Sequence, residues 1–426
     1  MSTRRQWQWR QVARKLWVRA AGFSLLAAGV AVLAIFVEPD IPDEVSRRIG
    51  AEAVGDLLDI IATSMLSVAI FSLTVMVAAQ NAATNTATPR AAQLVNEDRP
   101  SQNALGTFIG SFIFSLVGLI ALQTGLYDER GRVTLYLVTL VVIVIIVVTL
   151  LRWISHVFRL GMVGEIADLL ELRSAQVLRA HHERPFLGGT PWTSTRPVPE
   201  SAVPLFARQY GYVQHVDMEA LHALLEKARV KLFINSLPGA YTDAVQPLAW
   251  LERQAMDEET LARVRLAFTV ADVRTFDQDP RFGMTVLAEI ASRALSSAIN
   301  DSGTGIVVLS RVERLLSIWA QPRGEDAERI DYPLIHVPPV ELDDLFKDAL
   351  TPIARDGAGV VEIALRLQKT LHSLGTLNPA YTQVARHHSA LALERAEAAL
   401  GFGPDRERVR EAAHALQALP APDPVQ

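Results

Sequence analysis

The stretch VTLYLVTLVVIVIIVVTLL, residues 133–151, carries no charged side chain and decides the class of this protein. A helix needs about 20 apolar residues to cross about 30 Å of hydrocarbon, and this run has that length. Three further apolar runs precede it, at 20–37, 60–79 and 104–126. We therefore expect an α-helical membrane module with four transmembrane helices within residues 20–151.

The composition fits a membrane module joined to a soluble domain. Of the 426 residues, 50% are hydrophobic and 20% are charged. This is too apolar for an ordinary soluble protein and too charged for a chain that lies wholly in a membrane. The net charge of −5 lacks the basic character of a nucleic-acid-binding domain. The chain contains no cysteine, which leaves it without disulfides, thiolate metal ligands or thiol nucleophiles.

Lysine and arginine near the helix ends set the expected orientation, because cytoplasmic flanks are enriched in them. Residues 1–19 are basic and include Trp7, Trp9 and Trp17, so we expect an amphipathic segment at the lipid headgroups. The connection after the first run is rich in acidic residues. We expect both termini to lie in the cytoplasm and the protein to lie in the inner (plasma) membrane of a bacterial cell.

The second run carries a polar stripe, because its polar residues fall within a narrow arc at 100° per residue. The stripe comprises Asp56, Asp59, Thr63, Ser67, Thr74 and Asn81. One interpretation is the water-facing lining of a cation pathway with an acidic mouth. The other is that the hydroxyls bond to their own backbone carbonyls and pack helices, while the two aspartates lie outside the hydrocarbon.

The third run carries small residues at helical spacing, at Gly106, Gly110, Ser111 and Gly118. Small side chains let two helix backbones approach closely in a membrane. We expect a helix-packing face here, within one chain or between the subunits of a homo-oligomer.

Beyond residue 151 the sequence reads as a cytoplasmic α+β domain whose C-terminal part is helical. The expected segments are a stalk helix (152–183), a proline-rich linker (184–204), a small α/β subdomain (205–275), a mainly helical subdomain (276–419) and a frayed tail (420–426). Residues 263–270 alternate between apolar and polar, which predicts a strand.

A candidate cytoplasmic site comprises Arg274, Asp277, Asp279, Arg293, Asn300 and Asp301. Asparagine and aspartate before a helix commonly cap it through their own side chains, and this is the structural interpretation of Asn300 and Asp301. The functional alternative is a carboxylate–amide site for a cation or ligand. The acidic spacing matches no known metal loop, so the sequence assigns no metal or cofactor.

Several motifs of this chain resemble those of a family of bacterial predicted membrane proteins, the domain of unknown function, family 2254. The two most specific are RTFDQDPRFG at 274–283 and RALSSAIND at 293–301. The others are FSLT at 71–74, Thr88-Pro89-Arg90, LGTFIGSF at 105–112, GYVQ at 211–214 and Pro238-Gly239. The resemblance covers nearly the whole chain and implies a membrane protein without a known biochemistry. Ser297 and Ser302 stand where the family usually has proline, which implies a looser turn here.

Two functions from different classes fit these features. The favoured hypothesis is an oligomeric channel-like or transport protein whose cytoplasmic domain regulates it. The alternative is a membrane scaffold or sensor whose cytoplasmic domain binds a partner or ligand. No nucleophile–base pair, phosphate-binding loop or HExxH spacing is visible, so we do not expect an enzyme. The expected partners are the lipid bilayer, further copies of the chain, and an ion or small ligand, but no nucleic acid.

Overall fold

The computed structural model describes residues 6–7, 12–13, 16–34, 51–96, 98–159, 161–192, 198–253, 256–324, 327 and 329–419. Contacts divide the chain into two compact units. Trp9–Ile166 form the first, which we call the membrane unit. Ala167–Gln426 together with Met1–Gln8 form the second, which we call the C-terminal unit. The expected tail at 420–426 lies outside the described residues.

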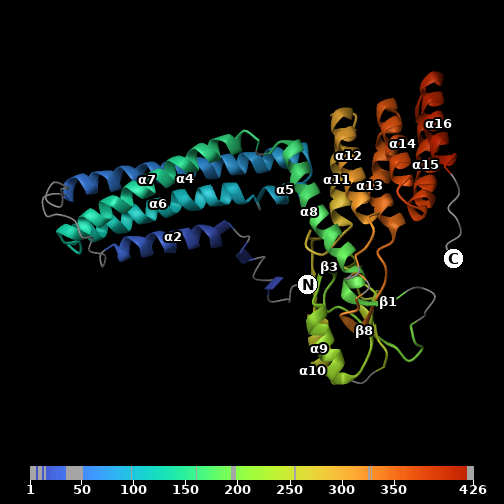
Figure 1. Ribbon diagram of the computed structural model, residues 1–426, viewed down its shortest axis with the longest axis horizontal. Coiled ribbons are helices and arrows are strands. Elements are labelled where there is room, and N and C mark those ends of the chain that lie inside the picture. The colour runs from blue at the N-terminus through green and yellow to red at the C-terminus, as the bar shows by residue number, and fades with distance from the viewer. Residues whose placement is uncertain are drawn as a thin grey trace. The chain divides into compact units, whose positions relative to one another are not determined.

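The membrane unit is a bundle of long helices (Figure 1). Its helices are α2 (Leu16–Leu33), α4 (Ala51–Thr86), α5 (Pro89–Asn96), α6 (Arg99–Gln123) and α7 (Glu129–Val157). Three of them, α4, α6 and α7, are long and apolar enough to cross a membrane. The sequence predicts four such helices. The first, at 20–37, appears as the shorter apolar helix α2, and the residues that follow position 34 are outside the described part.

Helix α6 presents its small residues to the neighbouring helices α2 and α4. A Cβ atom at Gly106 would lie 2.7 Å from the ring of Phe23, and one at Gly110 would lie 3.2 Å from the Phe23 carbonyl oxygen. At Gly118 the same atom would lie 3.2 Å from Leu58 of α4. Ser111 is buried as well. Absence of side chains at these glycines is what allows α2 and α6 to approach so closely.

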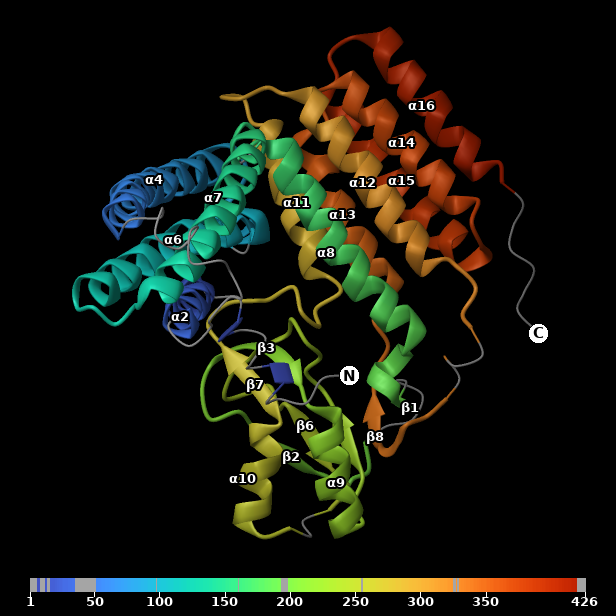
Figure 2. The ribbon, with the colours of Figure 1, turned by 60° about the vertical axis from the view of Figure 1, so that its left-hand side comes forward.

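The C-terminal unit contains an α/β part built on two sheets. A mixed five-stranded sheet has the order β1-β8-β4-β6-β2, and a three-stranded antiparallel sheet has the order β5-β3-β7. The strands are β1 (Gly189–Pro191), β2 (Val203–Leu205), β3 (Gly211–Val216), β4 (Leu232–Ile234), β5 (Tyr241–Thr242), β6 (Ala249–Leu251), β7 (Phe268–Ala271) and β8 (Tyr332–Val337). Helices α9 (Met218–Ala228) and α10 (Glu258–Leu266) belong to this part (Figure 2).

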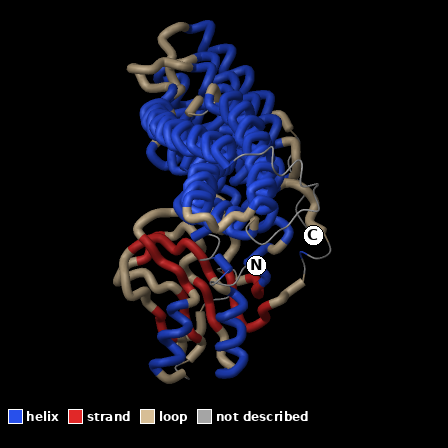
Figure 3. Tube along the Cα trace, turned by 90° about the vertical axis from the view of Figure 1, so that its left-hand side faces the viewer, coloured by secondary structure: helices blue, strands red, loops and turns tan. Residues whose placement is uncertain are grey.

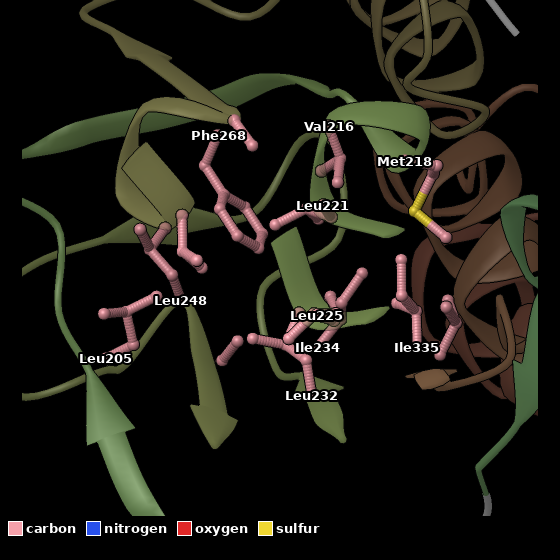
Figure 4. Close-up of a cluster of buried hydrophobic side chains, with 14 of the residues drawn as sticks. Leu205, Val216, Met218, Leu221, Leu225, Leu232, Ile234, Leu248, Phe268 and Ile335 are labelled. Atoms are coloured by element: carbon pink, nitrogen blue, oxygen red, sulfur yellow. The ribbon is translucent and has the colours of Figure 1, made fainter. Parts of the chain in front are cut away.

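One apolar core holds the α/β part together. Figure 4 shows Leu225 of α9 beside Leu232 and Ile234 of β4, and all three side chains are fully buried. Burial of one such side chain stabilises the fold by about 2 kcal/mol. Asp217 starts α9 by accepting a hydrogen bond from the backbone N–H of Ala220 at 3.0 Å.

The rest of the C-terminal unit is helical, and its strands gather in the α/β part, together with α9 and α10 (Figure 3). Its helices are α8 (Val163–Glu183), α11 (Phe282–Ala294), α12 (Ser302–Trp319), α13 (Leu342–Asp356), α14 (Val361–Gly375), α15 (Pro379–Ala399) and α16 (Gly403–Gln417). Ion pairs fasten α8 to α12, since Arg314 binds Glu171 through two hydrogen bonds of 2.7 Å.

Two segment boundaries differ from those expected. The predicted linker at 184–204 holds the 3-10 helix η1 (Pro185–Gly188) and strands β1 and β2. The sequence of Tyr332–Val337 predicts a strand, and the structure confirms it as β8. Strand β8 pairs in parallel with both β1 and β4, so the α/β part extends beyond 205–275 and includes a strand from the mainly helical segment. Such pairings between distant residues leave no local mark in the sequence.

Two helices also differ. The alternating residues at 263–270 are not one strand, because Asp257 accepts a hydrogen bond from the Thr260 N–H at 2.7 Å and starts α10 there. The expected stalk helix at 152–183 is interrupted between α7 and α8. Gly161 has φ +85°, and a Cβ there would lie 3.0 Å from the Ala79 carbonyl oxygen. Only glycine adopts this conformation without strain.

Candidate functional site

A cavity of about 460 Å³ lies in the C-terminal unit, where the α/β part meets the helical part. Its walls come from the turn after β4, the segment before α11, the loop after β8, the first turns of α13, and α8. Its polar lining comprises His181, Asn235, Arg274, Asp279, Arg281, Thr285, Glu341, Asp344 and Asp348. Cavities of this volume are the size at which proteins bind small molecules.

Asp279 organises one wall of the cavity and is almost completely buried. One carboxylate oxygen accepts hydrogen bonds from the backbone N–H groups of Arg281 (3.0 Å) and Phe282 (3.1 Å) at the start of α11. The other accepts from Arg274 Nε at 2.7 Å. Burial raises the pKa of Asp279, against the opposing effect of Arg274 and the two N–H groups. The turn at Gly239 (φ +95°) touches this carboxylate so closely that a Cβ would collide with it.

Arg274 is held in place from two sides. Its Nε donates to Asp279, and its guanidinium lies 4.9 Å from the centre of the Phe282 ring. Its two terminal nitrogens have no hydrogen-bond partner among the described residues. This side chain therefore offers a fixed pair of N–H donors at the cavity.

Arg281 and α13 form the opposite charged group. Arg281 binds Asp348 through two hydrogen bonds (2.7 and 3.1 Å) and Asp344 through a third (2.5 Å). The carboxylate of Glu341, one turn earlier on the chain, has no partner within the described part of the protein. Two arginines therefore face four carboxylates in the lining, a formal charge of 2 − 4 = −2.

His181 lines the cavity from α8 and is 5% exposed. Its Nε2 lies 2.8 Å from the carbonyl oxygen of Gln278. Because a carbonyl can only accept, Nε2 must carry the hydrogen, and Nδ1 is then an acceptor. Burial lowers the pKa of His181, which favours the neutral ring at pH 7.

The six residues of the predicted cytoplasmic site do not form one site. Arg274 and Asp279 line the cavity. Asp277 instead accepts a hydrogen bond from Trp7 Nε1 at 3.0 Å, and the Trp7 ring stacks on His215 with a centroid distance of 5.4 Å. The N-terminal Trp7 is thus buried in the C-terminal unit, whereas the sequence led us to expect it at the lipid headgroups.

Arg293, Asn300 and Asp301 lie at the other end of α11, whose 13 residues span roughly 20 Å. Asn300 has φ +52°. Asp301 starts α12 by accepting from the backbone N–H of Thr304 (3.0 Å) and from its hydroxyl (2.6 Å), which lowers the pKa of Asp301. This is the geometry of the capping turn. Arg293 Nε is buried without a partner among the described residues.

The sequence did not single out the remaining polar residues of the cavity. Arg281 belongs to the motif at 274–283, but its partners Asp344 and Asp348 lie more than 60 positions away. His181 is one of two adjacent histidines, and nothing in the local pattern distinguishes it from His182. Only the folded chain brings these side chains together.

The polar stripe of α4 lies on the outside of the membrane unit. All six of its side chains, from Asp56 to Asn81, are exposed there. Ser67 donates to the Thr63 carbonyl (3.1 Å) and Thr74 to the Ile70 carbonyl (3.0 Å), both within α4. In the described part of a single membrane unit, the stripe therefore encloses no pathway.

Comparison with known proteins identifies the family of this chain. A model described as "Predicted membrane protein (DUF2254)" matches residues 13–373. The chain belongs to this family. It is 27% identical over 304 residues to the uncharacterized proteins Mb1321c of Mycobacterium bovis and Rv1290c of Mycobacterium tuberculosis H37Rv. The match covers 67% of this chain and 57% of each relative, so the chain spans little more than half of their length. No solved structure matches it.

The lowered pKa of His181 predicts an acid-sensitive fold. The unfolded ring binds a proton near pH 6.5, whereas the buried ring does so only at lower pH, so the stability of the folded protein falls as pH drops below about 6.5. This single group contributes at most about 1.4 kcal/mol per pH unit. Thermal unfolding from pH 8 to pH 5 should show a smaller loss of stability in His181→Gln. The exposed His387→Gln is the control, and equal losses in the two variants would contradict the prediction.

Proposed function

We propose that this membrane protein is a sensor whose C-terminal unit binds a small molecule without transforming it. The cavity of about 460 Å³ carries this proposal, because charged and polar side chains converge on it and two of them, His181 and Asp279, are buried. A concave site of this volume with a few convergent polar groups is the usual form of a small-molecule site. His181 Nδ1 offers one acceptor, and the two terminal nitrogens of Arg274 offer N–H donors. The described lining holds no pair that resembles a nucleophile and its base.

A cavity-filling variant tests this proposal. We expect one or more compounds from a panel of amino acids, nucleotides, sugar phosphates and organic acids to raise the melting temperature of the full-length protein in detergent. Ala240 lines the cavity, so Ala240→Trp should abolish the shift by occupying the space. Ala390→Trp, at an exposed position of α15, is the matched control and should keep it. Shifts that persist in Ala240→Trp, or no shift at all, would count against a ligand in this cavity.

We also propose that α2 crosses the membrane, which gives four crossings. Trp7 supports this, because its contacts with Asp277 and His215 require residue 7 and the C-terminal unit to lie on the same side. The chain between them must then cross an even number of times, whereas α4, α6 and α7 account for three. The 18 residues of α2 span about 27 Å and supply a fourth crossing. The arginine-rich N-terminus favours the cytoplasm of a bacterial cell for that side.

The absence of cysteine from the sequence allows a direct topology test. Single cysteines at Ser2, Thr124 and Ala390 can be probed in intact cells with a membrane-impermeant maleimide. We expect Thr124→Cys, after α6, to react from outside, and Ser2→Cys and Ala390→Cys to react only after lysis. Labelling of Ser2→Cys and Ala390→Cys from opposite sides would overturn the four-crossing topology.

An oligomeric channel-like role is a second proposal, favoured by the exposed stripe of α4. Polar side chains facing lipid are costly, so a second copy of the chain or water is the better neighbour for this face. The hydrogen bonds of Ser67 and Thr74 to their own backbone reduce the cost of exposing this face to lipid. The stripe is therefore weaker evidence for a channel than the cavity is for a sensor.

Ion flux distinguishes the two proposals. If the stripe lines a cation pathway between subunits, Asp56→Asn should reduce cation flux into liposomes several-fold by removing charge from its mouth. The control is Glu362→Gln, at an exposed position of α14, which should leave the flux unchanged. Asp128→Asn would not serve, because Asp128 caps α7. A monomeric particle in native mass spectrometry with no flux above protein-free liposomes would exclude the channel.

A further inference from the structure

We propose that the ligand of the cavity carries an ammonium group and a carboxylate group, as an α-amino acid with an apolar side chain does. This inference rests on the proposed sensor function and names its ligand class. It comes from the hydrogen-bond acceptors and donors that the lining leaves without a partner among the described residues, and from the apolar residues that line the same cavity.

The acceptor side consists of His181, Glu341 and Asp344. The neutral His181 ring presents Nδ1, a bare acceptor on a side chain that is 95% buried, because Nε2–H is taken by the Gln278 carbonyl. Glu341 has a carboxylate with no partner in the described part of the chain, and Asp344 uses only one oxygen, for Arg281. An ammonium group has three N–H donors and a positive charge, which matches a set of acceptors with a negative balance.

The donor side is Arg274. Its Nε–H is held by Asp279 and its plane lies over Phe282, so the remaining edge presents two N–H groups in a fixed orientation. Two parallel N–H groups match the two oxygens of a carboxylate. Each nitrogen of Arg281 donates to Asp344 or Asp348, whereas Arg274 donates from Nε alone, so Arg274 has more N–H groups left for a ligand.

The lining argues against a phosphate ligand and against a metal ion. With a formal charge of −2 in the lining, a phosphate dianion would meet carboxylates at close range in a partly buried site. A metal ion is also disfavoured, since the described residues contain no group of three or more His, Asp or Glu side chains suited to one. A zwitterion adds no net charge, and its ammonium and carboxylate groups can bind the acceptors and the donors of the lining.

The apolar residues of the lining indicate which side chain the amino-acid ligand carries. Five apolar residues line the cavity, from the turn after β4 and the loop after β8: Leu237, Pro238, Pro338, Pro339 and Val340. The prolines have no N–H to offer a ligand. The volume of about 460 Å³ leaves room beyond an ammonium and a carboxylate, so an aliphatic side chain such as that of leucine is well accommodated.

Calorimetric titration of the full-length protein in detergent tests the inference with three probes. L-leucine carries both groups, 4-methylpentanoate lacks the ammonium, and 3-methylbutylamine lacks the carboxylate. Hydrogen bonds to charged groups contribute enough that each truncated probe should bind about 10- to 100-fold more weakly than L-leucine. Glu341→Gln should weaken L-leucine binding about tenfold and leave 4-methylpentanoate binding unchanged. Glu362→Gln should change neither.

The outcomes separate this inference from the function on which it rests. If 4-methylpentanoate or a sugar phosphate binds at least as tightly as L-leucine, and Ala240→Trp abolishes that binding, the amino-acid inference fails while the sensor proposal stands. If L-leucine does not bind, or if Glu341→Gln leaves its affinity unchanged, the inference is overturned. If L-leucine binds equally well to Ala240→Trp, its site is elsewhere and the assignment to this cavity fails.

Discussion

The buried carboxylate of Asp279 is the interaction on which the architecture of the site depends. It satisfies two backbone N–H groups at the start of α11, neutralises Arg274, and packs against Gly239 in the turn after β4. These contacts join the α/β part to the helical part of the C-terminal unit at a single point. A buried charge is stable only when its hydrogen bonds are complete, so the three groups must be positioned together.

The segment at 274–283 makes most of the contacts that build this site. Arg274 and Asp279 form the ion pair, Phe282 supports the guanidinium, and Arg281 reaches across to α13. Asp277, between them, binds Trp7 from the N-terminal end of the chain. Each of these positions therefore has a separate partner, and a change in one residue alters a contact that no neighbour in the sequence can replace.

Local signals predicted local structure well. The apolar runs gave the long helices of the membrane unit, and Asp217 and Asp301 act as the helix caps that their sequence positions suggest. Long-range pairing was beyond these signals. Strands β1 and β8 are separated by about 140 residues along the chain but lie side by side in one sheet. Likewise Arg293 and Asp301 seemed close to Asp279 in sequence, although helix α11 holds them apart.

The membrane unit shows how the same residue type can have opposite meanings. Gly106 and Gly110 of α6 are buried against Phe23, where a side chain would push α2 away. Gly22 and Gly29 of α2 are helical too, yet a Cβ at either would meet nothing within 4 Å. Glycines four residues apart, as in α6, or seven apart, as in α2, lie on one face of a helix, so the sequence predicts a close approach at both pairs. What distinguishes them is the partner helix, and for α2 that partner is α6, whose small residues make room for the bulk of Phe23.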